Sequence, residues 1–569
     1  MFFFQTETFT FCCVTSLSLL PASLKKKPAA SAAAGPAFDG VAAALATVRA
    51  SPLADDSTRT VDAFAAAAII EEGLEEPFYV VDLGVVVRRY LGWVSTMPRV
   101  TPFYAVKCCP DPAFIAILAS LGAGFDVASM KELQMVAAAG VGSGNPAAGA
   151  AGAGSLAERV IYANPCKMRS HLSFAACSGV TMTTFDSTDE LEKIAAVAPR
   201  AAAVLRIKAD DPNARCSVGH KFGALLSEVP ELLRVGQRLG LDMAGVSFHI
   251  GSGGASDPTW LCHAVVAARQ VFDVAAEMGI TMRLLDIGGG FSGGIGALEK
   301  VALGPNGLNA TIERLFPAAE GVRVIAEPGR YFAEATATLA CNVYGRRRRH
   351  DEEGPTLDYW ISDGVYGSMN CILYDHAVLS TRPPADPSRY GAPDGAGADP
   401  AIADAFEGAP LIKSTVFGPT CDGLDTLLRG APLPELQCGD WLLFPSMGAY
   451  TWSAGSNFNG FGRGEKAGGG STIKCYYVYS SEAVPAAEAA AGDAAAALPL
   501  TASMTAAGDG GFRLVEEVAA ESVAAVCGST AGRRSSAALP DTPEQSEFSE
   551  MSGDEAELAA MATGSPTWD

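Results

Sequence analysis

The sequence predicts an α/β protein built on a parallel (β/α)8 TIM barrel. Eight short strand-like runs follow one another between residues 100 and 330, and segments of helical period separate most of them. The runs are almost continuously apolar, as expected for parallel strands covered on both faces. An open flavodoxin-like sheet is the alternative, but it usually needs only five or six such units. The expected strands lie at residues 101–107, 124–129, 159–165, 181–187, 205–210, 245–253, 284–290 and 322–330.

Nearly every run ends on a residue suited to chemistry. Lys107 ends the first run, and Glu327 and Arg330 end the last. Barrel enzymes place their active sites at the C-terminal ends of the strands, because the loops that follow these ends meet on one face. We therefore expect an enzyme whose site lies on that face.

Helix start and stop signals between the runs support the same fold. Asp111 and Pro112 are placed to cap and open a helix after the first run, and Gly122 is placed to end it. A serine followed three residues later by a glutamate, the spacing of a capping box, occurs at Ser129 and Glu132 and again at Ser187 and Glu190.

Composition excludes several classes of protein. The chain has 569 residues and a net charge of −22, which argues against a nucleic-acid-binding protein because such proteins present a basic face. The 14 cysteines lack zinc-ligand spacing, so we expect reduced thiols and no metal site. No run of 18 or more uniformly apolar residues occurs, and we expect no membrane span.

Both ends are expected to be disordered extensions, residues 1–57 and 483–569. The first 36 residues contain one acidic residue, Glu7, and three consecutive lysines, a composition that suggests an organelle-targeting peptide although arginine is missing. A plain unstructured extension is the alternative. Residues 483–569 contain 14 acidic and 3 basic residues, which leaves 11 of the chain's 22 excess negative charges there. Such a segment buries too little apolar surface to offset the entropy of ordering it. Insertions are expected at 142–157 and 383–410.

Residues 331–482 differ in character from the barrel region. Short strand-like runs are separated by turn residues without long helical patterns, which predicts an all-β domain. The run Arg346–Arg349 is expected to be a solvated hairpin loop. The expected strands include residues 336–345, 357–364, 412–419 and 440–446.

Between about residues 60 and 480 the chain contains, in this order, the motifs PFYAVKC, GFDVAS, IYANPCK, TFDS, KFGA, GVSFHIGSG, LLDIGGGF, AEPGRYF, DGVYGSMNCILYDH, GPTCDGLD and MGAYT. These motifs, in this collinear order, resemble those of the eukaryotic ornithine decarboxylase family, alanine-racemase-fold enzymes that use pyridoxal 5′-phosphate (PLP). The resemblance implies a PLP-binding barrel over residues 83–330 and a β-sandwich domain over 331–482. It also implies that residues 58–82 supply the first strand of that sandwich, and that two chains form a homodimer with shared active sites.

Several residues match the family's cofactor site. Lys107 matches the lysine that forms the Schiff base to PLP, and a lysine ending an apolar strand is expensive unless it is paired or covalently used. On the residues alone, we expect burial to lower the pKa of Lys107. Glu327 matches the partner of the pyridine nitrogen, and His249 matches the histidine that stacks on the ring. The supporting charges around the cofactor are matched by Asp126, Glu132 and Arg206.

The phosphate group requires backbone donors and little steric bulk. Gly288, Gly289 and Gly290 follow an apolar strand and resemble the phosphate loop after strand seven of many barrels. A run of three glycines alone is weak evidence for phosphate binding, because such a run can also form a simple turn. Three further residues match family positions that complete the phosphate site: Ser252, Arg330 and Tyr450.

Substrate recognition is expected to depend on acidic groups, because the distal ammonium of ornithine requires carboxylates. Asp375 and Asp422 stand at the matching family positions, and Asp422 and Cys421 are implied to reach the partner's active site across the dimer interface. Cys421 is implied to return a proton to Cα after CO2 is lost. The substrate pocket is further matched by Tyr374, Asp425 and Phe458, and we expect structural roles for Asn164, Asp186 and Lys221.

The resemblance implies an enzyme that converts L-ornithine to putrescine and CO2, the first step of polyamine biosynthesis. The alternatives are a lysine, arginine or diaminopimelate decarboxylase, an amino-acid racemase, and a catalytically inactive regulator like the antizyme inhibitors. Diaminopimelate enzymes typically have Cys-Glu-Ser where this chain has Cys-Asp-Gly at 421–423. We expect a cytoplasmic enzyme, with a plastid or another organelle as the alternative, and an antizyme-like regulator as a possible partner.

Overall fold

The barrel is closed, parallel and eight-stranded in the computed structural model, which describes residues 36–53, 58–142, 154–253, 257–352, 354–384, 409–461 and 473–480. All neighbouring strands pair in parallel, and the last barrel strand pairs with the first through Val324 and Val100. The predicted barrel is therefore confirmed and the open-sheet alternative is wrong. In order around the barrel, the strands are β3 (Val100–Ala105), β4 (Gly124–Val127), β5 (Val160–Tyr162), β6 (Met182–Phe185), β7 (Ala202–Arg206), β8 (Asp242–Ser247), β9 (Leu284–Asp286) and β10 (Arg323–Ala326).

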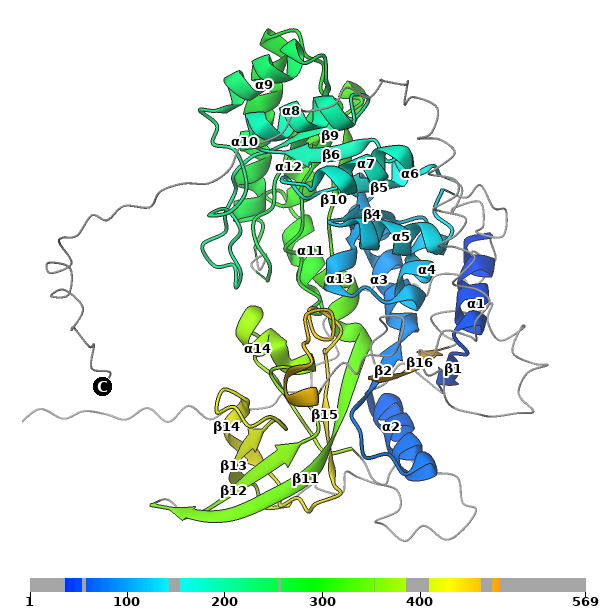
Figure 1. Ribbon diagram of the computed structural model, residues 1–569, viewed down its shortest axis with the longest axis vertical. Coiled ribbons are helices and arrows are strands. Elements are labelled where there is room, and N and C mark those ends of the chain that lie inside the picture. The colour runs from blue at the N-terminus through cyan, green and yellow to red at the C-terminus, as the bar shows by residue number, and fades with distance from the viewer. Residues whose placement is uncertain are drawn as a thin grey trace, which may run out of the picture. The chain divides into compact units, whose positions relative to one another are not determined.

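Helices alternate with these strands (Figure 1). Helix α3 (Leu83–Thr96) precedes the first barrel strand, and short α13 (Arg330–Ala333) follows the last. The helices between them are α4 (Pro112–Leu121), α5 (Met130–Ala138), α6 (Leu156–Arg159), α7 (Arg169–Cys177), α8 (Thr188–Val197), α9 (Val229–Arg238), α10 (Thr259–Glu277), α11 (Ala297–Ala302) and α12 (Leu308–Leu315).

The predicted helix signals act as expected at α4. The Asp111 carboxylate accepts hydrogen bonds from the amides of Ala113 and Phe114, and Gly122 ends the helix at a φ of 97°. At α5 and α8 the serine half of each predicted capping box forms, whereas the glutamate turns elsewhere. Glu132 accepts from the amide of Ala128, and Glu190 pairs with buried Lys167. At α8 a tertiary partner has therefore replaced half of the local motif, whereas at α5 the glutamate binds the amide one residue before the N-cap.

One apolar cluster joins seven of the eight barrel strands. Phe103 of β3 packs there, and its ring lies where a side chain at residue 124 of the neighbouring β4 would stand, so glycine is required at that position. Strands covered on both faces leave no solvated side, which explains the continuous apolar runs. The members of the cluster are Phe103, Ile161, Ala163, Met182, Ala202, Val204, Ala244, Leu284 and Ile325.

The second domain is a separate mixed sheet. Strand β11 (Ala337–Asp351) pairs with β2 and β15 near its start and with β12 along the rest of its length. Strand β2 (Phe78–Asp82) comes from the segment that precedes the barrel, as the resemblance implied. The other members are β1 (Ser51–Leu53), β12 (Gly354–Ile361), β13 (Ile412–Phe417), β14 (Thr426–Leu433), β15 (Trp441–Phe444) and β16 (Lys474–Ser480).

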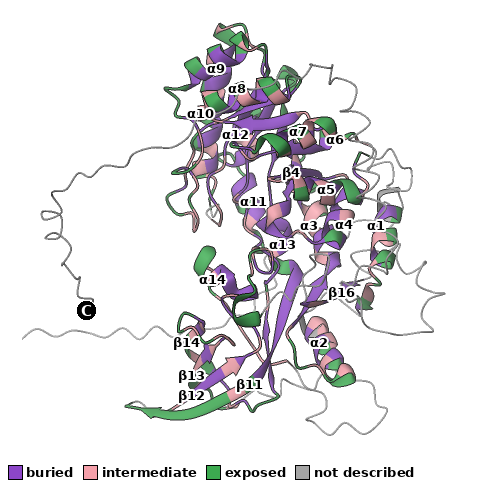
Figure 2. Ribbon diagram, in the orientation of Figure 1, coloured by how far each residue is buried: buried purple, intermediate pink, exposed green. Residues whose placement is uncertain are grey.

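The expectation for the arginine run needs correction. Residues 346–349 belong to β11 and pair with β12, so they form a strand of a long hairpin and not a loop. This part of β11 is solvated, as expected (Figure 2). The charges are also compensated, because Arg347 and Arg349 both contact Asp358, and Arg348 contacts Glu435.

Part of the expected N-terminal disorder is also wrong. Residues 36–53 contain helix α1 (Pro36–Thr47) and strand β1, which pairs in parallel with β16. Val41 and Leu45 of α1 are buried in the main core, and that apolar spacing binds the helix to the fold. Helix α2 (Thr58–Glu72) then leads to β2.

Two smaller differences from the predictions concern where a strand and an insertion begin or end. The fifth expected strand, 205–210, was placed too late in the chain, because the corresponding strand β7 begins at Ala202, within an alanine stretch of low strand propensity. Helix α6 begins inside the expected insertion at 142–157. Residues 1–35, 143–153, 385–408 and 481–569 lie outside the described residues, and so do most of the predicted extensions and insertions. None of the helices in the described ranges is long and apolar enough to span a bilayer.

Candidate active site

The predicted cofactor residues converge at the C-terminal ends of the barrel strands. Lys107 lies in a short 3-10 turn directly after β3, and its ammonium pairs with Asp126 from the adjacent β4. The Asp126 side chain is fully buried, whereas that of Lys107 is 39% exposed. The lysine is thus anchored at its tip and still open to a ligand.

The charge state of Lys107 differs from the expectation. Burial by itself lowers the pKa of the ammonium, but the nearby carboxylates of Asp126 and Glu327 outweigh this effect, and the net direction is upward. We expected the effect of burial on the pKa of Lys107 to be larger than that of nearby charges. The prediction failed because one sequence run does not reveal that two further strands bring carboxylates to the same point.

Two carboxyl groups lie at the ends of β9 and β10. Burial, together with neighbouring Asp286 and Asp126, raises the pKa of Glu327 well above its usual range. Burial also raises the pKa of Asp286 to about 7. Like charges this close disfavour double ionisation. The pair is therefore poised to hold a proton or to pair with a cationic ring nitrogen.

His249 lies in the loop after β8 and is neutral. Burial, reinforced by Arg206 and Lys107, lowers the pKa of its imidazole well below the usual range. Its Nδ1 accepts a hydrogen bond of 3.0 Å from the amide of Gly251, so the proton of the neutral ring lies on Nε2. A side chain at Gly289 would stand 2.8 Å from that Nε2. The imidazole therefore packs directly against the glycine loop.

The glycine loop after β9 requires glycine for two reasons. Gly288 has a φ of +64°, and a Cβ there would lie 2.0 Å from the carbonyl oxygen of Phe248. Gly290 has a φ of +106°. The backbone amide of Glu327 donates a hydrogen bond of 2.7 Å to the carbonyl of Gly288, and this bond connects the glycine loop to the end of β10. Such a loop lets a phosphate approach the backbone closely.

Arg330 connects the loop to the other predicted phosphate residues. Its Nη2 lies 3.2 Å from the hydroxyl of Ser252, and its guanidinium lies over the ring of Tyr450, 5.2 Å from the centroid. The Tyr450 amide donates to the carbonyl of Cys108, next to Lys107. Ser252, Arg330 and Tyr450 are thus brought together from three separate stretches of chain.

Asp375 contacts Arg330, one of the residues expected to bind the phosphate, which was not expected. Its carboxylate is buried and pairs with Arg330 at 2.5 Å, and its other oxygen lies 3.8 Å from the sulfur of Cys216. We expected Asp375 to face the substrate. Neighbouring Tyr374, by contrast, is 69% exposed.

The remaining substrate residues form a second group in the β domain. Asp422 accepts a short hydrogen bond from the hydroxyl of Tyr366, whose ring lies 4.4 Å from that of Phe458. The backbone amide of exposed Cys421 donates a hydrogen bond of 3.2 Å to Oδ1 of Asn459. Buried Asp425 accepts from the amides of Val365 and Thr420 and so holds the loop that carries Cys421.

The expected supporting residues make local contacts. Glu132 caps the amide of Ala128, and burial raises the pKa of its carboxyl group. Asn164 accepts from the amide of Cys166, and Asp186 accepts from that of Gly223. Both Arg206 and Lys221 lie over the ring of Phe222.

Sequence reasoning missed four residues of the site. Asp286 stands inside the LLDIGGG motif, and its position beside the glycines was the available signal. The other three residues do not directly follow a predicted strand, and nothing in the sequence around them indicated a site: Arg215, Cys216 and Glu334. They become visible only because the loop after β7 pairs with the loop after β8, through Cys216 and Ser252.

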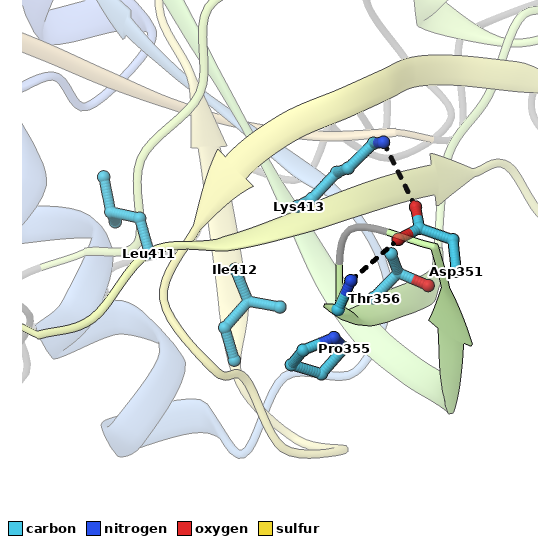
Figure 3. Close-up of a pocket in the computed structure, with 7 residues that line it drawn as sticks. Asp351, Pro355, Thr356, Leu411, Ile412 and Lys413 are labelled. Carbon is cyan, nitrogen blue, oxygen red and sulfur yellow. Dashed lines mark hydrogen bonds and ion pairs between the residues drawn. The ribbon is translucent and has the colours of Figure 1, made fainter.

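A separate hollow of about 310 Å³ lies in the β domain at the hairpin of β11 and β12 (Figure 3). Its main polar contact joins Lys413 to Asp351 at 3.1 Å. None of the predicted site residues lines this hollow. The lining residues are Asp351, Gly354, Pro355, Thr356, Leu411, Ile412 and Lys413.

Unsatisfied buried atoms in the barrel site match the groups of PLP. Within the described part of the chain, Oδ1 of Asp126, Oδ2 of Asp286 and Nε of Arg330 have no hydrogen-bond partner. Buried polar atoms are normally paired, and these three belong to residues at the C-terminal ends of the barrel strands, which is consistent with a ligand site there. Asp286, with Glu327 beside it, fits a protonated ring nitrogen, Arg330 fits a phosphate, and Lys107 with its partner Asp126 fits the aldehyde. The residues present therefore fit the cofactor.

Comparison with known proteins agrees with this geometry. Residues 83–334 match the family described as pyridoxal-dependent decarboxylase, pyridoxal binding domain. The chain is 45% identical over 390 residues to a chloroplastic ornithine decarboxylase from Nicotiana glauca, covering 68% of this chain and 82% of the relative. It is 44% identical over 403 residues to ornithine decarboxylase from Mus musculus, covering 68% and 79%. The chain belongs to the ornithine decarboxylase family.

Solved structures extend the likeness to the fold of this family. An arginine decarboxylase from Paramecium bursaria Chlorella virus, bound to agmatine, is 31% identical with a TM-score of 0.61, covering 74% of this chain and 100% of the other. A lysine/ornithine decarboxylase from Vibrio vulnificus, complexed with putrescine, is 25% identical with a TM-score of 0.58, covering 74% and 98%. Membership of the family makes the chain a PLP-dependent carboxy-lyase acting on a small molecule.

Proposed function

We propose that the protein decarboxylates L-ornithine to putrescine and CO2, the first step of polyamine biosynthesis. The observation that carries the proposal is the convergence of Lys107, Glu327 and the glycine loop at one barrel face, in a chain that is 45% identical to an ornithine decarboxylase. The family match alone leaves the amino acid open, because related structures act on arginine and lysine.

Each residue group has a distinct role in this proposal. Lys107 would hold the cofactor covalently, and Asp126, which pairs with its amine, would orient it. Glu327 and Asp286 would pair with a protonated pyridine nitrogen, because a cation there offsets the like negative charges that these two buried acids bring together. When bound, PLP supplies the electron sink that makes loss of CO2 from an amino acid feasible. Neutral His249 packs against the ring without adding a competing positive charge.

The backbone of residues 288–290, together with Ser252, Arg330 and Tyr450, would hold the phosphate. Arg330 pairs with Asp375, and a phosphate bound to Arg330 would compete with that carboxylate for the same guanidinium. Asp375 would then be available to the distal ammonium of the substrate. A buried carboxylate favours a cationic side chain of the right length, which supports a basic amino acid as substrate.

We further propose that Cys421 and Asp422 act in the active site of a partner copy. Their contacts join them to Asn459 and Tyr366 of the same β domain, and the sulfur is exposed. Exposed apolar side chains near them support a homodimer interface, since patches of this kind mark association sites. They are Leu373, Tyr374, Leu424, Phe458 and Phe461. Cys421 would deliver a proton to Cα in that shared site.

The experiment for the activity measures 14CO2 release from labelled ornithine, lysine and arginine by the purified protein, with the Lys107→Ala variant as the blank. We expect the highest kcat/KM with ornithine and putrescine as product. Release from lysine or arginine alone would replace the substrate, and no release above the blank would refute the activity.

The shared site is tested by mixing two inactive variants, Lys107→Ala and Cys421→Ala. With random exchange about half of the dimers are mixed, and each mixed dimer regains one intact site, so activity should recover to roughly a quarter of wild type. Absence of recovery, despite subunit exchange shown by differently tagged chains, would mean that each chain builds its own site.

Two additional proposals depend on the resemblance. We propose a cytoplasmic enzyme, with the plastid as the alternative because one relative is chloroplastic. A fluorescent fusion of the full chain, compared with one lacking residues 1–35, distinguishes the two locations.

We also propose that an antizyme-like regulator binds the monomer, and dissociation of the dimer by a purified antizyme would support this.

A further inference from the structure

A second arginine lies beside the phosphate residues. Arg215 follows β7, and the next residue, Cys216, forms two backbone hydrogen bonds with Ser252, of 3.0 and 3.3 Å. The Arg215 side chain crosses Gly253, where a Cβ would stand 2.3 Å from its Nε. The chain therefore places this guanidinium next to the serine that is expected to bind phosphate.

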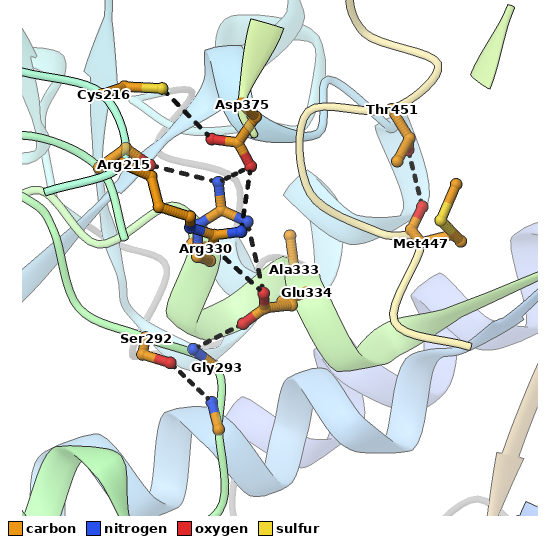
Figure 4. Close-up of polar contacts among 12 residues, drawn as sticks. Arg215, Cys216, Ser292, Gly293, Arg330, Ala333, Glu334, Asp375, Met447 and Thr451 are labelled. Atoms are coloured by element: carbon orange, nitrogen blue, oxygen red, sulfur yellow. Dashed lines mark hydrogen bonds and ion pairs between the residues drawn. The ribbon is translucent and has the colours of Figure 1, made fainter. Parts of the chain in front are cut away.

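Arg215 and Arg330 share the same two carboxylates. Arg330 contacts Asp375 at 2.5 Å and Glu334 at 3.4 Å, whereas Arg215 lies 3.8 Å from each. Figure 4 shows the two guanidinium groups between Asp375 and Glu334. Charge-assisted hydrogen bonds usually measure 2.7–2.9 Å. The contacts of Arg215 are thus long enough to be exchanged readily for those of a better anion.

The charge of the ligand supports a second cation. A phosphate monoester carries close to two negative charges at pH 7, and one guanidinium neutralises only one of them. Nε of the buried Arg330 is unpartnered among the described residues, which indicates that an acceptor is missing at this point. Arg215 is 31% exposed in its side chain and can turn toward that acceptor.

We propose that Arg215 is a second phosphate-binding residue for the cofactor, held in place by Glu334 and Asp375 until the phosphate arrives. The proposal rests on PLP binding at this barrel face. It goes further by assigning the phosphate two arginines. Glu334 then competes with the phosphate for Arg215 through one carboxylate oxygen, while the other accepts the amide of Gly293 at 2.9 Å in the loop that follows the glycines.

The alternative is that Arg215 and Glu334 form only a structural clasp between loops. The two explanations predict different effects for Glu334→Gln. Glutamine keeps an oxygen for the Gly293 amide but removes the charge that competes for Arg215. A clasp would be weakened by either variant in the same way, whereas phosphate binding would be weakened only by loss of the arginine.

The experiment titrates the full-length protein, resolved from its cofactor, with PLP and with pyridoxal, which lacks the phosphate. Arg215→Ala should weaken PLP binding about tenfold, the scale of one charge-assisted contact, and leave pyridoxal binding unchanged. Arg215→Lys should recover part of the loss, and Glu334→Gln should bind PLP at least as tightly as wild type. Arg234→Ala, which removes an exposed arginine on α9, is the matched control.

Three results would overturn the assignment: equal loss of PLP and pyridoxal in Arg215→Ala, equal loosening by Arg215→Ala and Glu334→Gln, or no change in either variant. Arg215→Lys keeps the test valid if the alanine variant does not fold. Failure of the proposed function is distinguishable, because it would appear as a wild-type protein that releases no CO2 from ornithine while its PLP affinity still depends on Arg215.

Discussion

The buried carboxyl of Asp286 offers the sharpest test of the site's electrostatics. Its side chain is fully buried beside Glu327, and replacing it by asparagine removes the charge while keeping an oxygen for the amide of Gly288, which it accepts at 2.9 Å. A rise of the pKa from 3.8 to about 7 corresponds to ~4 kcal/mol of destabilisation once the group is ionised.

The sign follows from the direction of the shift. Because the folded-state pKa lies above the unfolded one, the folded protein binds more protons between about pH 4 and pH 7, and stability falls as pH rises through this window. Asp286→Asn should therefore stabilise the cofactor-free protein at pH 8, by at most ~4 kcal/mol, and by less as the pH falls toward 4. The figure is an upper limit because the neighbouring Glu327 also has a raised pKa, and the two acids influence each other's ionisation.

The assay is urea unfolding of the cofactor-free full chain at pH 5 and pH 8. Asp242→Asn is the control, since it removes only an exposed ion pair with Arg283, worth less than ~1 kcal/mol. Equal effects of Asp286→Asn at the two pH values, or destabilisation at pH 8, would refute the reasoning. In the holoenzyme the variant should instead weaken PLP retention, because the acidic pair then balances a cationic ring nitrogen.

Four other predictions follow from the same geometry. Lys107→Ala should lose the absorbance of covalently bound cofactor and nearly all activity; full activity would remove Lys107 from its role. Glu327→Gln should lower kcat by ~10²-fold or more with a smaller effect on KM, and an unchanged kcat in steady-state assays would contradict its position at the ring nitrogen. Gly288→Ala should abolish PLP binding or folding, since its Cβ would meet the Phe248 carbonyl at 2.0 Å, and wild-type PLP affinity would count against this. Lys167→Met should destabilise the fold by ~3 kcal/mol in urea unfolding, because Glu190 keeps only Lys193; an unchanged midpoint would show the buried pair to be neutral.

The barrel could be predicted from the sequence because its information is local. Each strand is a short apolar run that must be covered on both faces, and signals such as Asp111 and Gly122 mark where a helix begins and ends. Because parallel strands all end on the same face, the order of the runs also predicted that Lys107, Asp126 and Glu327 would meet. Motifs that must approach a ligand closely, such as the glycines at 288–290, are visible for the same steric reason.

Only the tertiary structure decided which charges act on one another. Residues from different strands and loops together produce the upward pKa of Lys107, the raised pKa values of Asp286 and Glu327, and the contact of Asp375 with Arg330. Electrostatic effects depend on distance and burial, and neither can be read from one run of residues. Packing also explains why α1 was not predicted. Its alanine-rich sequence resembles a disordered extension, and only the folded structure shows that Val41 and Leu45 are buried in the core. The sequence by itself determined the barrel and the residue types of the site, and packing determined their charge states and partners.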